Sequence, residues 1–194
     1  MANTKISGLN GVTSLASTDL LAAVNSGETK KVTAKQLSQH SELGWGRYDD
    51  TQYTSLNKLN LVDGVQVNIP NNAGNTILSP ESYVFYDPAT NKVCGLGEND
   101  CYTLTVVFKA SAANANSTHL DFSMYSPVGD FERIRKAMSF YKANDEEQNF
   151  HEVFQYYADA NFVSNGVELK INSDGGSAKI WDVIFFIQRT QRYF

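Results

Sequence analysis

The chain contains few of the residues from which catalytic and metal sites are usually built. Its 194 residues include two cysteines and three histidines. The histidines, His40, His119 and His151, lie in separate segments, and none has a second ligand at the spacing of a metal site. No phosphate loop, nucleophile elbow or regular set of calcium ligands is present in the sequence. We therefore predict no catalytic, cofactor-binding or metal-binding residues, and we do not expect an enzyme.

Basic residues are also scarce. The chain has 16 lysines and arginines against 21 aspartates and glutamates, for a formal net charge of −5. Phosphate contacts need clustered basic side chains, and the ones here are scattered, so nucleic acid is not an expected partner. The sequence has no apolar run of about 18 residues and no signal-peptide pattern after Met1. We expect no membrane partner, and assembly in a host cytoplasm.

The cysteines Cys94 and Cys101 bracket residues 95–100. This spacing would let them face each other across a hairpin, where a disulfide would close the loop in an oxidising compartment. In a cytoplasm the reduced thiols are favoured. Because a zinc site would need a further cysteine pair or histidine nearby, we interpret both as small apolar residues near a loop.

The pattern of apolar residues divides the chain into an arm, residues 1–44, and a body, residues 45–194. The arm holds short apolar clusters separated by Gly, Asn, Ser and Thr. None is long enough to build a core, so we expect the arm to become ordered by lying on another surface. The pattern breaks at residues 41–46, where glycines flank Trp45, and this segment is the predicted hinge.

The arm has predicted structure of its own. Residues 19–24 predict a strand, and residues 30–32 predict a second strand that pairs with it across a turn at residues 25–28. The sequence Thr33-Ala34-Lys35-Gln36 is a capping-box pattern and predicts a short helix toward His40. The side chains expected to carry the docking contacts are Lys5, Ile6, Leu9, Asp19, Leu20, Leu21, Val24, Lys30, Lys31, Val32 and Leu37.

The body shows the two-residue alternation of strands. Predicted strands cover residues 59–69 with a bend or bulge at Asp63-Gly64, 83–86, 102–108, 118–125, 134–141, 149–157, 162–171 and 179–189. Residues 131–142 also fit a helical spacing, but a helix would leave a sandwich one strand short. The last segment is apolar on both faces, as in a central strand. Asp174-Gly175-Gly176 predicts a hairpin turn.

About eight strands at regular spacing predict an all-β fold, an antiparallel β-sandwich of the jelly-roll type. Aromatic residues stand next to each other at Phe85-Tyr86 and Tyr156-Tyr157. Alternation along a strand would send one ring of each pair outward, while the other ring packs in the core. An outward ring could line a subunit interface or stack on a sugar, and both alternatives stay open at this point.

Three motifs of the arm lie in a distinctive order: Lys5-Ile6-Ser7-Gly8-Leu9, Thr18-Asp19-Leu20-Leu21, and Lys30-Lys31-Val32-Thr33 followed by Leu37. This order resembles the N-terminal anchor of structural proteins from tailed bacteriophages, in particular head decoration proteins, head fibres and some tail-fibre subunits. The body, which ends in residues 176–190, is similar to the trimeric jelly-roll or tumour-necrosis-factor-like heads that such anchors carry. Residues 41–48 leave no room for a fibre shaft.

The resemblance implies a bacteriophage capsid decoration, or cement, protein. Such a protein would lie in the virion on the outer surface of the capsid, bind the major capsid protein through its arm, form a homotrimer and stabilise the shell. The alternative is a tail or head fibre module that binds a receptor, recognising a glycan on the host surface.

Overall fold

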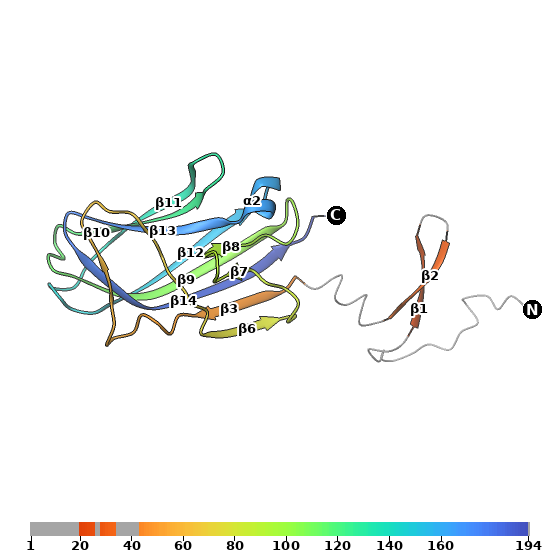
Figure 1. The fold of residues 1–194 in the computed structure, drawn as a ribbon, viewed down its shortest axis with the longest axis horizontal. Helices are drawn as coiled ribbons and strands as arrows, with labels where there is room; N and C mark the ends of the chain where they lie inside the picture. Colours follow the sequence, from red (N-terminus) through yellow and green to blue (C-terminus); the bar gives the residue numbers. More distant parts are fainter. Residues whose placement is uncertain (1–19, 26–27, 34–42, 194) are drawn as a thin grey trace, which may run out of the picture. The chain divides into compact units, whose positions relative to one another are not determined.

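The computed structural model describes residues 20–25, 28–33 and 43–193 (Figure 1). The chain divides into two compact units, Met1–Glu42 and Leu43–Phe194. Among the described residues, no helix is long and apolar enough to cross a membrane.

The first unit contains the predicted hairpin. Strands β1 (Leu20–Asn25) and β2 (Glu28–Thr33) pair antiparallel, with Leu21 opposite Val32. Of the predicted docking residues, Leu20, Leu21, Val24, Lys30, Lys31 and Val32 lie in this hairpin, and Lys31 is exposed. The other docking residues, Lys5, Ile6, Leu9, Asp19 and Leu37, lie outside the described residues, as does the predicted short helix.

The second unit is a sandwich of two antiparallel sheets, which confirms the predicted fold class (Figure 1). Sheet I has the order β12-β9-β14-β3-β6, and β4 also pairs with β14; sheet II has the order β11-β10-β13-β8-β7, and β5 also pairs with β13. The strands of sheet I are β3 (Trp45–Asp49), β4 (Leu59–Leu61), β6 (Asn75–Ser79), β9 (Cys101–Ala112), β12 (Gln148–Tyr157) and β14 (Ala178–Gln191). Those of sheet II are β5 (Val67–Asn68), β7 (Tyr86–Asp87), β8 (Lys92–Val93), β10 (His119–Ser126), β11 (Phe131–Ser139) and β13 (Val167–Asp174).

Alternation along the strands builds the core between the sheets. Every second residue of β9, from Tyr102 to Phe108, is fully buried, and the intervening residues are half-buried. Aromatic rings join the two layers: Phe122 of sheet II stacks on Phe154 of sheet I with their ring centroids 4.7 Å apart. Such contacts fix the spacing of the sheets as well as burying apolar area.

Consecutive strands cross repeatedly from one sheet to the other, as in a jelly roll. After β9 in sheet I, the hairpin β10-β11 lies in sheet II, β12 in sheet I, β13 in sheet II and β14 in sheet I. The prediction of a hairpin turn at residues 174–176 is therefore wrong, because this segment carries the chain between sheets. The hairpin that the spacing of Cys94 and Cys101 would allow does not form, since β8 and β9 lie in different sheets; both cysteines are free thiols, the state that the sequence favoured.

Two predicted strands differ in part from the structure. Residues 59–69 form two separate strands, β4 in sheet I and β5 in sheet II, and the predicted bend at Asp63-Gly64 lies in the crossing between them, where Gly64 has a φ of 73°. Residues 160–165 form helix α2 (Ala160–Asn165) rather than the start of a strand. Asp159 caps this helix by accepting a hydrogen bond from the Phe162 N–H, and Gly166 ends it with a φ of 65°.

The remaining differences concern short or polar segments. Strand β3 begins at Trp45, so Trp45 and Gly46 are not part of a hinge. Residues 83–85 precede β7 and are not in a strand. Strand β6 lies at the edge of sheet I and is mostly exposed, with Ile77 and Leu78 adjacent rather than alternating, which explains why alternation did not reveal it. Residues 131–139 form strand β11 and not a helix, and β14 is central in its sheet, both as predicted.

Candidate functional site

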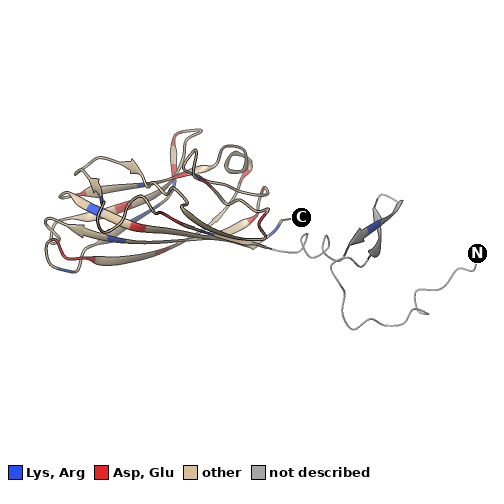
Figure 2. Cartoon of the chain, turned by 60° about the horizontal axis from the view of Figure 1, so that its bottom comes forward, with Lys and Arg blue, Asp and Glu red and all other residues tan. Residues whose placement is uncertain are grey.

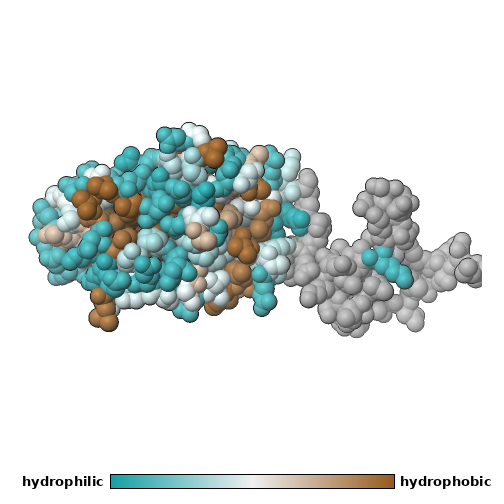
Figure 3. Space-filling view, in the orientation of Figure 1, coloured by the Kyte–Doolittle hydropathy of each residue, from teal (hydrophilic) through white to brown (hydrophobic). Residues whose placement is uncertain are grey.

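The outer side of sheet I carries apolar side chains that the body leaves partly exposed. Phe186 of β14 lies in register with Arg47 of β3 and Thr105 of β9. Trp45 stacks on Phe186, with a centroid distance of 5.5 Å. Ile184 and Val107 are also half-buried, and Ile77 and Val153 are exposed. A space-filling view of one face shows apolar residues reaching the surface in separate patches among polar ones (Figure 3). Partly exposed aromatic and aliphatic side chains of this kind are typical of a protein interface.

A groove of about 400 Å³ lies between β11 and β12, the edge strands of the two sheets. Two rings at its border remain open to solvent, with Phe131 43% and Tyr157 60% exposed. Lys136 spans the same pair of strands, because its Nζ donates to the Val153 carbonyl at 2.6 Å and lies 3.2 Å from Glu152 Oε2. The groove is lined by Phe131, Glu132, Arg133, Ile134, Gln155, Tyr156, Tyr157 and Asp159.

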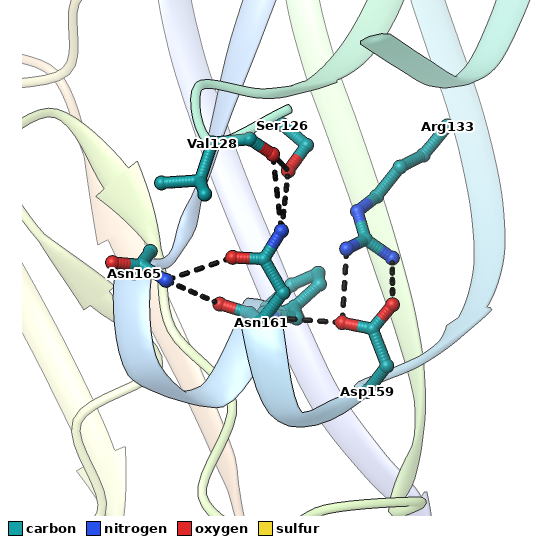
Figure 4. Close-up of polar contacts among 7 residues, drawn as sticks. Ser126, Val128, Arg133, Asp159, Asn161 and Asn165 are labelled. Carbon is teal, nitrogen blue, oxygen red and sulfur yellow. Dashed lines mark hydrogen bonds and ion pairs between the residues drawn. The ribbon is translucent and has the colours of Figure 1, made fainter. Parts of the chain in front are cut away.

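Arg133 and Asp159 in this groove are held rigidly (Figure 4). Both terminal nitrogens of Arg133 donate to the carboxylate of Asp159 at 2.9 Å. The Arg133 guanidinium lies 5.1 Å from the ring of Phe131 and 5.6 Å from that of Phe162. The hydrogen bonds from Arg133, together with the one from the Phe162 N–H, hold the pKa of the Asp159 carboxyl below its usual range. One bidentate pair thus fixes a groove side chain and the start of α2 together.

Helix α2 is also tied to the turn between β10 and β11 (Figure 4). The Asn161 side-chain amide donates to the Val128 carbonyl at 3.0 Å and to Ser126 Oγ at 3.3 Å. Asn165 donates back to Asn161 Oδ1 at 2.7 Å. These contacts position one end of the groove wall.

The alternation argument for adjacent aromatic residues is right for one pair and wrong for the other. Tyr157 points outward, and Tyr156 packs inward between Tyr102 and Phe162 at centroid distances of 5.3 and 5.1 Å. Burial of the Tyr156 hydroxyl raises its pKa well above the usual value. Phe85 and Tyr86, in contrast, are both buried. Phe85 precedes β7, so strand alternation does not govern its direction.

A buried ion pair holds the segment where the chain enters the body. Arg189 Nη1 lies 3.2 Å from Asp100 Oδ2, and the two side chains are 4% and 2% exposed. Arg189 Nε donates to the Leu43 carbonyl at 2.7 Å, and the Tyr193 N–H donates to Asp100 Oδ1 at 2.9 Å. The first and last described residues of the body are therefore joined through one pair of charges.

Charged residues are otherwise spread over the strands and loops of the body and form no single block of one sign in the view shown (Figure 2). One cluster that the sequence did not reveal lies on sheet II. His119 Nε2 is 3.3 Å from Asp174 Oδ2 and 3.9 Å from Asp121 Oδ2. His119 and Asp121 are two residues apart on β10, whereas Asp174 is distant in sequence. The pairing of β10 with β13 brings Asp174 beside them.

No protein-family model matches the chain, and no curated protein matches it. Solved structures do share its architecture. The vertex protein P5 of PRD1 is similar with a TM-score of 0.51 and 9% identity, over 96% of this chain and 90% of that one. The tumour necrosis factor Eiger from S. frugiperda is similar with a TM-score of 0.50 and 8% identity, over 78% of this chain and 94% of that one.

These similarities define the class of fold. The body is an antiparallel β-sandwich of the jelly-roll type, and its fold is similar to that of both solved structures. At identities this low, the similarity carries the fold and not the activity.

Proposed function

We propose that this chain is a non-enzymatic virion structural protein that decorates a bacteriophage capsid. The observation that carries the proposal is the contrast between its two units. The body has a continuous core of its own, whereas β1 and β2 form a two-stranded sheet without a third strand among the described residues. An isolated two-stranded hairpin is marginally stable in water. An arm of this kind supports attachment to a larger surface. The similarity in fold to the vertex protein P5 of PRD1 supports a role in a virion.

The arm is the proposed contact with the major capsid protein on the outer surface of the shell. Burial of an apolar side chain such as Leu20, Leu21 or Val24 contributes about 1.5 to 3 kcal/mol before ordering costs are subtracted. The charges of Asp19 and of Lys30 and Lys31 would set the register of docking more than its strength. Ile6, Leu9, Val32 and Leu37 complete the apolar set, and Lys5 adds a further charge.

The body is proposed to form a homotrimer through the outer side of sheet I, where Trp45 and Phe186 stack while still partly exposed. Covering these rings with a second copy would remove apolar area from water. Three arms on one trimer would bind a symmetric shell far more tightly than a single arm, because the second and third contacts become intramolecular.

Binding to purified empty shells tests the proposal. The full chain should co-sediment with shells, and a variant without residues 1–40 should stay in the supernatant while keeping the circular dichroism and oligomeric state of the body. A matched variant, Tyr141→Ser, changes an exposed ring of the body and should bind like the full chain. Undiminished binding by the truncated chain would refute the arm as the docking element.

The groove between β11 and β12 favours a second candidate function, a fibre module that binds a glycan on the host surface. Its exposed rings, Phe131 and Tyr157, are of the kind that stack on sugars, and Gln155 and Glu132 supply polar groups beside them. Imaging of virions that carry the labelled protein separates the two functions. Copies over the whole shell support decoration, whereas a few copies at the tail, together with loss of host adsorption in Tyr157→Ala virions, support receptor binding.

A further inference from the structure

The outer side of sheet II brings three metal-ligating side chains to one place. In the pairing of β10 with β13, His119 lies opposite Asp174, and Asp121 lies opposite Asn172. Residues two apart on a strand share a face, so the four side chains occupy one side of the sheet. The opposite side of the same two strands is filled by core residues such as Leu120 and Ile171.

The distances between these donors suit a small cation. One ligand atom from each of His119, Asp121 and Asp174 can be chosen so that all lie within 4.8 Å of one another. His119 Nε2 lies 3.3 Å from Asp174 Oδ2 and 3.9 Å from Asp121 Oδ2. Ligand atoms about 2.0–2.2 Å from a tetrahedral metal are roughly 3.3–3.6 Å apart, so small movements of exposed side chains would complete the geometry.

Asn172 provides an independent observation at the same place. Its Oδ1 atom is buried and has no hydrogen-bond partner among the described residues. A buried acceptor without a donor costs free energy, and a cation can supply the missing partner. Asn172 lies between Asp174 and Lys170 on the outer face of β13, directly opposite Asp121.

A cation at this place would compete with Arg135. Arg135 Nη2 donates to Asp121 Oδ2 at 2.6 Å, and this contact raises the pKa of the Arg135 guanidinium. The Asp121 side chain is only 11% exposed, while that of Arg135 is 56% exposed and can swing into solvent. A cation could therefore replace the exposed Arg135 guanidinium as the partner of the Asp121 carboxylate, which is mostly buried.

We propose that His119, Asp121 and Asp174 bind a first-row divalent transition metal of the zinc type, with Asn172 Oδ1 as an additional oxygen ligand. Imidazole favours Zn²⁺ over Ca²⁺, which is bound by oxygen ligands alone. The metal would join β10 to β13 at the end of sheet II where loop 113–118 ends and loop 175–177 begins. This inference concerns the body alone and does not depend on the proposed role on the capsid.

Calorimetric titration of the full chain with zinc chloride tests the site. His119→Gln should weaken zinc binding by at least about tenfold. Loss of a residue that only hydrogen-bonds to a metal ligand already lowers metal affinity by about this factor, and His119 is proposed as a ligand itself. The matched control is His151→Gln, an exposed histidine of sheet I, which should bind like the parent. A Cys94→Ser/Cys101→Ser variant should also bind like the parent, which excludes thiolate ligation.

Arg135→Gln gives the sharpest result, because removal of the competing guanidinium should strengthen zinc binding several-fold. Saturating zinc should also raise the melting temperature of the parent by about 5 to 10 °C, and that of His119→Gln by much less. No measurable binding by the parent, equal weakening in the His119 and His151 variants, or weaker binding in Arg135→Gln would each overturn the proposal.

Discussion

The ion pair between Arg189 and Asp100 is expected to be the most sensitive polar contact of the body. Replacing Arg189 with Met removes the charge but keeps an unbranched apolar stem. The Asp100 carboxylate would then remain buried with the Tyr193 N–H at 2.9 Å as a remaining donor. Loss of one member of a buried ion pair costs about 3 to 5 kcal/mol, because the other charge stays desolvated and uncompensated.

The structure adds a second contribution to this cost. Arg189 Nε also donates to the Leu43 carbonyl at 2.7 Å, so Arg189→Met frees the segment that precedes β3. A loss of this size is a large part of the 5 to 15 kcal/mol that stabilises a typical domain. We therefore expect Arg189→Met to lower the urea midpoint substantially and to increase proteolysis near residue 43.

The assay is equilibrium urea unfolding of the full chain at a fixed protein concentration, followed by near-ultraviolet circular dichroism. Arg47→Met is the matched control, because Arg47 forms an exposed pair with Asp49 at 2.8 Å. Exposed pairs contribute about 0 to 1 kcal/mol. The double variant Arg189→Met/Asp100→Leu should be more stable than Arg189→Met alone, since no charge remains buried. Equal losses in the Arg189 and Arg47 variants would refute the reasoning.

Three further outcomes are expected. Phe186→Asp should shift the oligomer toward monomer in sizing with light scattering, whereas Tyr141→Asp, at an exposed loop, should not; unchanged mass in both variants contradicts the proposed interface. Asp159→Asn should cost about 1 kcal/mol or less at neutral pH, because the Asp159 side chain is 38% exposed. Since the folded pKa of Asp159 is lowered, its contribution is present above the unfolded pKa of about 4 and is lost as pH falls through the lower folded value, so Asp159→Asn should flatten the acid limb of the stability curve. Capsids that lack the protein should assemble at normal size but rupture at a lower temperature, and identical rupture temperatures would count against decoration.

The sequence alone determined the long strands. Alternation in β9, β10 and β12 and the continuous apolar run of β14 are local properties, because side chains two residues apart share a face whatever the strand pairs with. The same argument predicted that one ring of the Tyr156-Tyr157 pair points outward, and that ring is Tyr157. It did not predict the edge strand β6, which is mostly exposed and has its two apolar residues next to each other rather than in alternation.

Tertiary structure decided which sheet each strand joins. Nothing local distinguishes a turn within a sheet from a crossing between sheets, so residues 174–176 resembled a hairpin turn and residues 59–69 a single strand. The sequence around Phe162 fits strand alternation. In the structure, however, Phe162 lies in helix α2, which Asp159 caps and Gly166 ends, and its ring packs on Tyr156.

The cluster of His119, Asp121 and Asp174 shows the same limit at a candidate site. Sequence spacing excluded a metal-ligand motif, because the ligands of such motifs are usually close along the chain. Here the register of β10 against β13 supplies the proximity instead. Register depends on how the whole chain closes its core, since a slip of one residue would move every apolar side chain of β10 to the solvent face. The sequence therefore showed which residues can bind a metal. Which of them lie side by side was decided by the tertiary structure, through the packing of the two sheets.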